Sequence, residues 1–204
     1  MDPRTLRTTD ALLAAADRVF ADRALESVTV EEIAAEAGVA VGSIYNHFGS
    51  KAGLHAAVVE RALDVDRAHM DRAYVDGRSP VDQIRAAAAE YLRFALDQPE
   101  HFRMLASPPA PGRYAAGRRT AEVLGRRVAE QNERLAAAIR AGVGSGELRP
   151  VDPEATATAL WAAWNGIIGL GWRPDGLRRE PAQLQELLSV AVDLVEFGLL
   201  ARNP

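Results

Sequence analysis

The sequence predicts an all-α protein with an N-terminal three-helix domain, residues 1–52, and a larger helical domain, residues 53–204. Apolar residues recur at helical spacing along most of the chain, and the segments between them contain helix-capping residues, prolines and glycines. No run of alternating apolar and polar residues indicates a strand, and no internal repeat stands out.

The composition is that of an ordinary soluble protein, with 48% apolar and 25% charged residues among 204. The chain has no cysteine, which excludes disulfides and thiolate metal sites. It contains no apolar run of membrane-spanning length and no signal-peptide core near its N-terminus. We therefore expect a cytoplasmic protein that makes no membrane contact.

The first helix is expected to begin at Thr8 or Thr9 and to end near Phe20. The preceding segment carries Arg4 and Arg7, and it is open to two interpretations. It is either a short basic arm that reaches along a nucleic acid or a frayed terminus without a role.

The segment from Val28 to Lys51 has the strongest local signals in the chain. Thr29 and Glu32 have the spacing of a capping box, in which each side chain binds the other residue's backbone N–H. Val28 and Ile33 flank this cap at the positions of a hydrophobic staple. A helix is therefore predicted to begin at the capping box.

Gly38 is placed to end that helix in the left-handed conformation, and a second apolar stripe resumes at Val41. Two short helices joined by a glycine-containing turn indicate a helix-turn-helix, whose second helix can enter the major groove of DNA. The same pattern also occurs in helical proteins that have no DNA role, so other features must decide.

Three such features favour DNA binding. The second helix exposes small or neutral hydrogen-bonding residues where a solvated face would carry charges. No acidic residue lies between Ala37 and Val59, as a phosphate-facing surface requires. Lys51, the only lysine in the chain, follows a capping Ser50 at a helix start, where the helix dipole disfavours a cation. The charge balance argues against DNA binding, because residues 1–60 hold 5 basic and 9 acidic residues. If this domain binds DNA, the acids of its first two helices must therefore face away from the duplex.

The segment resembles the DNA-binding domain of TetR-type transcriptional regulators, most densely between Thr8 and Leu54. The resemblance rests on Ile33-Ala34, Ala37-Gly38-Val39, Gly42-Ser43-Ile44-Tyr45, His47-Phe48 and Ser50-Lys51. Two positions depart from the family pattern. Ala40 replaces a capping Ser or Thr, and Asn46 stands where an aromatic residue is common and can pair with adenine.

The resemblance implies which residues meet double-stranded DNA. Phosphate contacts are expected from Thr29, Tyr45, His47 and Lys51. Base edges are expected to face Gly42, Ser43 and Asn46, with Val41 packed near them. A palindromic operator and a homodimer follow, because one recognition helix per chain needs a partner to span two half-sites.

The rest of the chain reads as helices. A long linker helix is expected over 51–74, and prolines open further helices at 80 and 99. Ser107 to Gly112 reads as a loop, Arg113 to Ala141 as a helix, and residues 142–146 as a glycine-rich loop. Asp152 caps a helix that starts at Pro153, and Pro181 starts the last one.

A small-molecule effector site is expected between the linker helix and the helices after Pro80. Its candidate residues are aromatic, sulfur-containing or polar side chains on otherwise apolar helices: His69, Tyr91, Phe94, Phe102, Met104, Trp161 and Asn165. Most aromatic and methionine residues at helical spacing are plain core. Asn165 is the sharpest candidate, because a buried amide needs a partner.

The last two helices carry an apolar surface that is too wide for one core. We expect a homodimer interface there, formed by Trp161, Trp164, Leu188, Val195 and Gly198, unless these residues are buried within their own chain.

The sequence thus predicts a DNA-binding regulator, a repressor released by a small apolar or aromatic effector, without catalytic residues, metal or cofactor. A ligand-dependent activator or co-repressor of the same fold is the main alternative. A helical enzyme or an adaptor without DNA binding is a distant one, since no nucleophile, phosphate-loop or metal-ligand motif is present.

Overall fold

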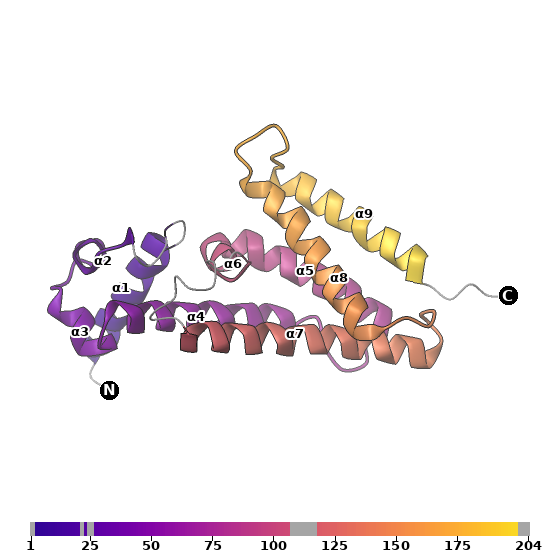
Figure 1. Cartoon of the computed structure of the whole chain (residues 1–204), viewed down its shortest axis with the longest axis horizontal. Coiled ribbons are helices and arrows are strands. Elements are labelled where there is room, and N and C mark those ends of the chain that lie inside the picture. Colours follow the sequence, from indigo (N-terminus) through magenta and orange to yellow (C-terminus); the bar gives the residue numbers. More distant parts are fainter. Residues whose placement is uncertain (1–2, 21–22, 24–26, 107–117, 200–204) are drawn as a thin grey trace. The chain divides into compact units, whose positions relative to one another are not determined.

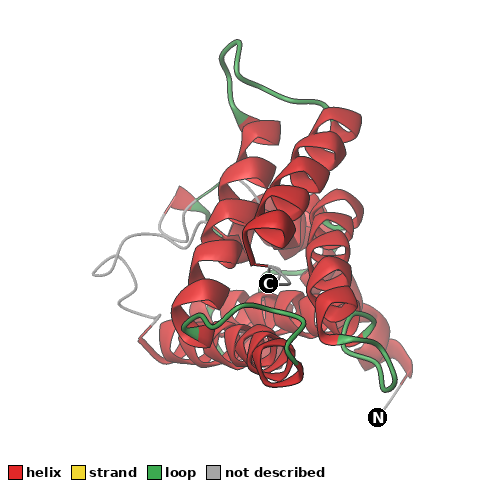
Figure 2. Ribbon diagram, turned by 90° about the vertical axis from the view of Figure 1, so that its right-hand side faces the viewer, coloured by secondary structure: helices red, strands yellow, loops and turns green. Residues whose placement is uncertain are grey.

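The computed structural model describes residues 3–20, 23, 27–106 and 118–199. Nine α-helices and one short 3-10 helix lie within these ranges (Figure 1), and the same ranges contain no strand (Figure 2). In chain order they are α1 (Pro3–Phe20), α2 (Val30–Ala37), α3 (Gly42–Phe48), α4 (Lys51–Asp71), α5 (Pro80–Asp97), α6 (Pro99–Ala106), α7 (Arg118–Ser145), α8 (Pro153–Gly169), η2 (Leu170–Trp172) and α9 (Pro181–Leu199). The predicted all-α fold class is confirmed.

Several helices begin at the predicted residues. The capping box before α2 is complete: Glu32 N–H donates to the Thr29 hydroxyl at 3.2 Å, and Thr29 N–H donates to the Glu32 carboxylate at 2.8 Å. The Asp152 carboxylate accepts from Ala155 N–H at 2.7 Å at the start of α8. α5 and α9 start at the expected prolines, Pro80 and Pro181.

Two helices extend beyond their predicted limits. The prediction that α1 begins at Thr8 or Thr9 is wrong, because the helix already starts at Pro3. The hydroxyls of Thr8 and Thr9 bond back to the carbonyls of Arg4 and Thr5 one turn earlier, so they do not cap the helix. α7 likewise continues through the expected glycine-rich loop and ends at Ser145.

The predicted loop from Ser107 to Gly112 and the predicted start of the following helix at Arg113 lie outside the described residues. The predicted linker helix over 51–74 ends three residues early, at Asp71.

The chain divides into two compact units, and two of the boundaries between them fall within the helices α4 and α7. Unit 1 comprises residues 1–65 and 98–125, and unit 2 comprises residues 66–97 and 126–204. The predicted boundary at 52/53 falls at the start of α4, whereas the compact units separate within that helix. α4 therefore supplies residues to both units.

Unit 1 has a continuous apolar core. Leu12, Ala15, Ala16 and Phe20 of α1 pack with residues that are essentially inaccessible to solvent, including Val28 before α2, Ile33 of α2 and Ile44 of α3. α6 also belongs to this unit and contacts α1. The His101 imidazole of α6 lies with Nε2 3.1 Å from the Asp17 carboxylate of α1.

Unit 2 is built from α5, α8 and α9, which contact one another, and from parts of α4 and α7. Its core includes Phe94 of α5, Ile139 of α7 and Ile168 of α8, each at most 1% exposed. None of the helices in the described ranges combines the length and the apolar content that crossing a bilayer requires.

Candidate nucleic-acid and effector sites

The turn between α2 and α3 is set by the backbone of one glycine. Gly38 has φ +66° and ψ +32°, the left-handed region that a side chain disfavours, and its N–H closes the last turn of α2. Val39 N–H then donates to the Ala34 carbonyl at 3.0 Å. This Schellman-type ending turns the chain sharply, so α3 starts four residues after Gly38.

α3 divides into a core face and an exposed face. Ile44 is fully buried, and the half-buried Val41 and Phe48 pack against the same core. Gly42, Tyr45 and Asn46 are exposed, at helical positions i, i+3 and i+4. The exposed face is therefore neutral and rich in hydrogen-bonding groups. As expected from Ala40, α3 begins without a side-chain cap.

The predicted base-facing residues are not equally accessible. Gly42 and Asn46 lie on the exposed face, and Ser43 is half-buried beside them. Val41 belongs to the core face, so its contribution is to anchor the helix. An exposed Asn can donate and accept at the same base edge.

The predicted phosphate-binding residues are held by contacts within unit 1. His47 Nδ1 lies 3.2 Å from the Thr9 hydroxyl of α1. Lys51 Nζ donates to the Val28 carbonyl at 2.6 Å. The Thr29 hydroxyl is engaged in the capping box, whereas Tyr45 is 51% exposed. Tyr45 and His47 lie on α3 itself, Thr29 precedes α2 and Lys51 begins α4, so the fold of unit 1 fixes their relative positions.

Two of the three acidic residues of α2 pair with arginines. Arg18 binds Glu36 at 2.8 Å, and Arg23 binds Glu32 at 3.0 Å. The hydrogen bond from the Thr29 backbone and the contact with Arg23 lower the pKa of Glu32 to about 2. The acidic balance of residues 1–60 is therefore partly cancelled locally, which reduces the repulsion that α2 would exert on a phosphate backbone.

The seven predicted effector residues do not form one group. Tyr91, Trp161 and Asn165 are brought together: the Tyr91 hydroxyl donates to the Asn165 side-chain oxygen at 3.1 Å, and the Asn165 amide donates to the Trp161 carbonyl at 2.9 Å. The Tyr91 ring also lies 6.3 Å from that of Trp164. Three helical residues of unit 2 thus form a polar contact between α5 and α8.

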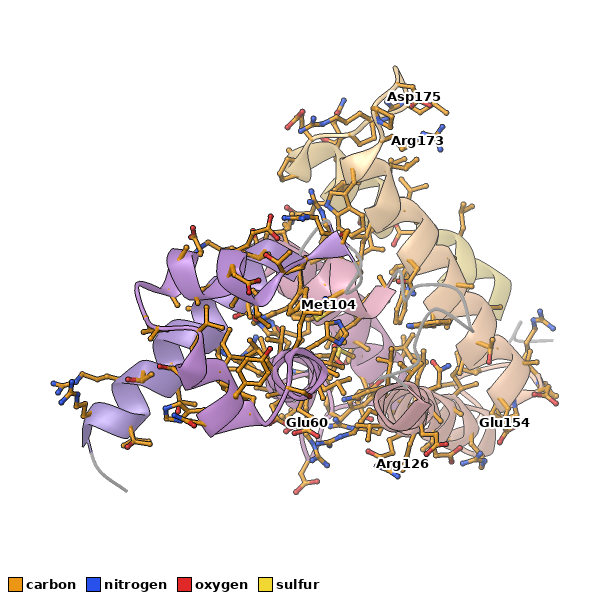
Figure 3. The ribbon with its side chains drawn as sticks, turned by 60° about the vertical axis from the view of Figure 1, so that its left-hand side comes forward. Glu60, Met104, Arg126, Glu154, Arg173 and Asp175 are labelled. Carbon is orange, nitrogen blue, oxygen red and sulfur yellow. The ribbon has the colours of Figure 1, made fainter. Side chains whose placement is uncertain are left out.

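The other four predicted effector residues lie elsewhere. Phe94 is core, and it packs against the His69 ring at 5.6 Å. His69 also neighbours Glu90, a buried carboxylate that Arg72 and Arg93 bind at 2.9 and 2.6 Å. Phe102 and Met104 belong to α6 in unit 1, where Met104 packs against the core of that unit (Figure 3).

Unit 2 also has a groove between α5 and α9 with a volume of about 530 Å³. Its lining includes the apolar residues Ala88, Leu92, Leu96, Leu188 and Val192 and charged residues of both signs. No predicted effector residue lines this groove.

The residues predicted for the dimer interface take different positions. Trp164 and Leu188 are each only 3% exposed and pack inside their own chain, and Trp161 is half-buried beside Tyr91. Gly198 is exposed, and the side chain of Val195 lies outside the described part. The face of α9 that remains open carries Leu187, Val190 and Leu194, which are 36%, 54% and 70% exposed.

α8 presents a matching face of small residues. Ala155, Ala159, Ala162, Ala163 and Gly166 are all exposed and recur at the spacing of one helix side. α8 and α9 lie against each other (Figure 1), so unit 2 offers two helices with small or apolar outer residues.

These features define a helix-turn-helix protein whose second helix has a neutral exposed face and whose chain also forms a second helical unit. Two family models match the chain: bacterial regulatory proteins of the tetR family over residues 12–58, and the tetracyclin repressor-like C-terminal domain over residues 84–195. The chain belongs to the TetR family, and it is a DNA-binding transcriptional regulator.

Individual relatives agree with this assignment. A helix-turn-helix-type transcriptional regulator of Staphylococcus aureus is 28% identical over 82 residues, which are 40% of this chain and 44% of that protein. The match thus spans less than half of that relative. A TetR-family regulator from Rhodococcus sp. has a similar structure, with a TM-score of 0.77 and 25% identity over 93% of this chain and 98% of the other.

A second solved structure, that of AibR in complex with isovaleryl coenzyme A and operator DNA, has a TM-score of 0.72 and 22% identity. It covers 92% of this chain and 97% of that one. At this identity the likeness concerns the fold.

Proposed function

We propose that this chain is a homodimeric repressor that binds a palindromic operator through α3 and is released from it by a small molecule bound in unit 2. The observation that carries the DNA half of this proposal is the exposed face of α3. Gly42 and Asn46 present small and amide groups there, beside Tyr45, without any charged residue.

An exposed helix face of this composition suits a major groove. A glycine lets the helix approach the base edges closely, and an asparagine can bind adenine with two hydrogen bonds. Lys51 and Thr29 lie on the segments that flank α3, and His47 lies in the last turn of α3, where phosphates of the same groove would pass. The proposal therefore assigns base contacts to α3 and backbone contacts to its surroundings.

The outer faces of α8 and α9 support the proposed dimer. Leu187, Val190 and Leu194 expose apolar surface along one side of α9, with Gly198 on the same side. The alanines and Gly166 of α8 would allow close approach of two helix pairs, as in an intermolecular four-helix bundle. We therefore assign the interface to these residues, and Trp164 and Leu188 to the core of each subunit.

Coupling between a ligand and DNA would use α4. This helix begins at Lys51 beside α3, and its last residues, from Asp66 on, belong to unit 2. A ligand that favours one orientation of α4 would change the spacing of the two recognition helices in the dimer. A coupling free energy of about 1–3 kcal/mol would lower operator affinity roughly 5- to 150-fold.

AibR, which was crystallised with both an acyl coenzyme A and operator DNA, supports the idea that this fold can serve a ligand-responsive DNA-binding protein. Its ligand is not transferred to this chain, because at 22% identity the likeness concerns the fold alone.

The test is selection of the operator from a pool of random duplex DNA, followed by titration of the selected duplex. We expect an inverted repeat bound by one dimer. Selection of no sequence would contradict the proposal, and so would selection of a single half-site bound by a monomer.

A further inference from the structure

Unit 2 contains a group of polar side chains from four different helical segments, which we call the core polar cluster. Its members are Asp66 of α4, Tyr74 just after α4, Tyr91 of α5, Arg134 of α7 and Asn165 of α8. Of these, Tyr91 and Asn165 are among the seven predicted effector residues. Asp66 is 9% exposed, and an acid at that depth requires a specific reason.

Part of the cluster is internally satisfied. Tyr91 and Asn165 bind each other, and Asn165 also binds the Trp161 backbone. Arg134 stacks over the Tyr74 ring, with its guanidinium carbon 4.6 Å from the ring centre. Its NH1 group lies 2.8 Å from the exposed carboxylate of Asp71, so the guanidinium already has an anionic partner.

Two buried polar atoms are not satisfied by any described residue: one carboxylate oxygen of Asp66, Oδ1, and the hydroxyl of Tyr74. A buried polar atom without a partner costs about 1–3 kcal/mol, and more if it carries charge. Folded proteins therefore rarely keep two such atoms in one cluster without a reason.

The electrostatics show that these groups share one environment. Burial raises the pKa of Asp66 to about 7, and the nearby Arg134 opposes this rise. Burial also raises the pKa of Tyr74 and of Tyr91, and the Asp66 carboxylate adds to both shifts. The two phenols thus stay protonated beside a buried acid.

We infer that the core polar cluster binds the polar end of the effector, and that this end is a hydrogen-bond donor, a hydroxyl or an ammonium, on an otherwise apolar molecule. The inference rests on the proposed ligand-responsive function. Asp66 Oδ1 would accept the ligand's hydrogen, and the Tyr74 hydroxyl would provide a second contact. The rings of Tyr91, Trp161 and Trp164 would contact the apolar body.

The cluster disfavours a ligand with an anionic end. A carboxylate or phosphate would face the buried Asp66 carboxyl, while the nearby cation Arg134 is already paired with Asp71. The acid therefore discriminates between ligands by their charge as well as by their shape.

Asp66 also lies on the helix that leads to the DNA-binding site. It follows Lys51 by 15 residues on α4. A ligand held by Asp66 therefore acts directly on this helix, and no further element has to relay its effect.

The experiment uses matched probes that differ only in the polar end. For each of three bodies, phenylbutyl, naphthylethyl and decyl, the alcohol, the primary amine, the carboxylic acid and the unsubstituted hydrocarbon are titrated into the full-length protein at pH 7.5. Binding is followed by tryptophan fluorescence and by the shift in melting temperature.

We expect at least one alcohol or amine to bind the parent protein about tenfold more tightly than its hydrocarbon and its acid. Asp66→Leu should abolish this preference and leave binding of the hydrocarbon unchanged. Asp64→Asn removes an exposed carboxylate from the same helix and should keep the preference. The melting temperature without probe shows that each variant is folded.

Equal binding of all four probes, tighter binding of the acid, binding of no probe, or a preference that survives in Asp66→Leu would each overturn the inference. Comparing the affinities of the amine and the alcohol shows whether the site prefers an ammonium or a hydroxyl as the ligand's polar end. Binding of the selected operator is measured with the same samples, so failure of the ligand inference with intact operator binding is distinguishable from failure of the proposed DNA-binding function.

Discussion

The Lys51 ammonium donates a hydrogen bond to the backbone carbonyl of Val28, with Nζ 2.6 Å from the oxygen. This contact ties the first turn of α4 to the residue that precedes the Thr29 cap of α2. The only lysine of the chain is thus fixed beside both helices of the helix-turn-helix. A cation held in this way can meet a phosphate without losing further conformational freedom.

Replacing Lys51 with Met should weaken binding to operator and to random duplex alike, because a phosphate contact carries no sequence information. The slope of log K against log salt should fall by about one unit. The lost hydrogen bond to Val28 should cost on the order of 1 kcal/mol of stability, measured by urea unfolding. Lys51→Arg keeps the charge and should retain most of the salt dependence. An unchanged slope in Lys51→Met would remove this residue from the interface.

Asn46→Ala should act on sequence preference. Because Asn46 is exposed, stability should change by less than about 0.5 kcal/mol. Binding to the selected operator should weaken by about 1–3 kcal/mol, and preference at one base pair of each half-site should be lost. The measurement is competition between operators substituted at single positions. Equal losses on operator and random DNA would mean that Asn46 contacts only the backbone.

Gly38→Ala should destabilise unit 1 by about 1–2 kcal/mol, because the turn requires φ +66° and a β-carbon strains that conformation. Gly144→Ala is the matched control: it is exposed, helical and has no atom near the added carbon, so it should be neutral or stabilising. Thermal unfolding compares the two variants. Similar effects at both positions would show that the turn tolerates a side chain.

The outer face of α9 provides a test of assembly. Val190→Glu puts a charge in the proposed seam, where desolvation is costly, and should yield a folded monomer with reduced operator affinity. Gln185→Glu adds the same charge to an exposed position on the opposite side of α9 and should leave the assembly unchanged. Sedimentation velocity measures whether each variant is a monomer or a dimer. A dimer of unchanged affinity in Val190→Glu would place the interface elsewhere.

The buried Asp66 makes a specific prediction about pH. Its pKa is about 7 in the folded chain and about 3.9 in an unfolded one, so the folded state holds the extra proton between these values. Stability is fully present below about pH 4 and is lost as the pH rises through about 7. Relative to Asp66→Asn, the parent should therefore lose on the order of a few kcal/mol between about pH 4 and pH 8. Urea unfolding of both proteins along this series measures the difference, and parallel curves would contradict the assignment.

Much of the DNA-binding unit could be predicted from the sequence, because its signals are local. The Thr29–Glu32 box, the Gly38 turn and the core positions Ile33 and Ile44 depend on residues within a few positions of one another. The sequence predicts the wrong start for α1 because threonines often cap helices. The hydroxyls of Thr8 and Thr9 instead donate to carbonyls one turn earlier inside the helix.

Unit 2 was less predictable because its site depends on residues far apart in the sequence. The spacing of Leu188 and Trp164 fits an internal core and an interface equally well, and only packing separates the two. In the sequence, Asp66 looks like one more charge on a long helix, and nothing near it indicates that it is buried. A hydrogen-bond partner for Asn165 could be predicted from the sequence, since a mid-helix amide among apolar residues requires one, and the structure shows that this partner is Tyr91.

The measurement that tests the central claim most directly is the affinity of the parent dimer for its selected operator and for a scrambled duplex, between about 50 and 200 mM salt. The account predicts that both affinities fall as salt rises, since phosphate contacts release counterions, while the preference for the operator persists. It also predicts that Asn46→Ala lowers this preference and that Lys51→Met does not. Equal affinity of the parent for both duplexes at every salt concentration would contradict sequence reading by α3.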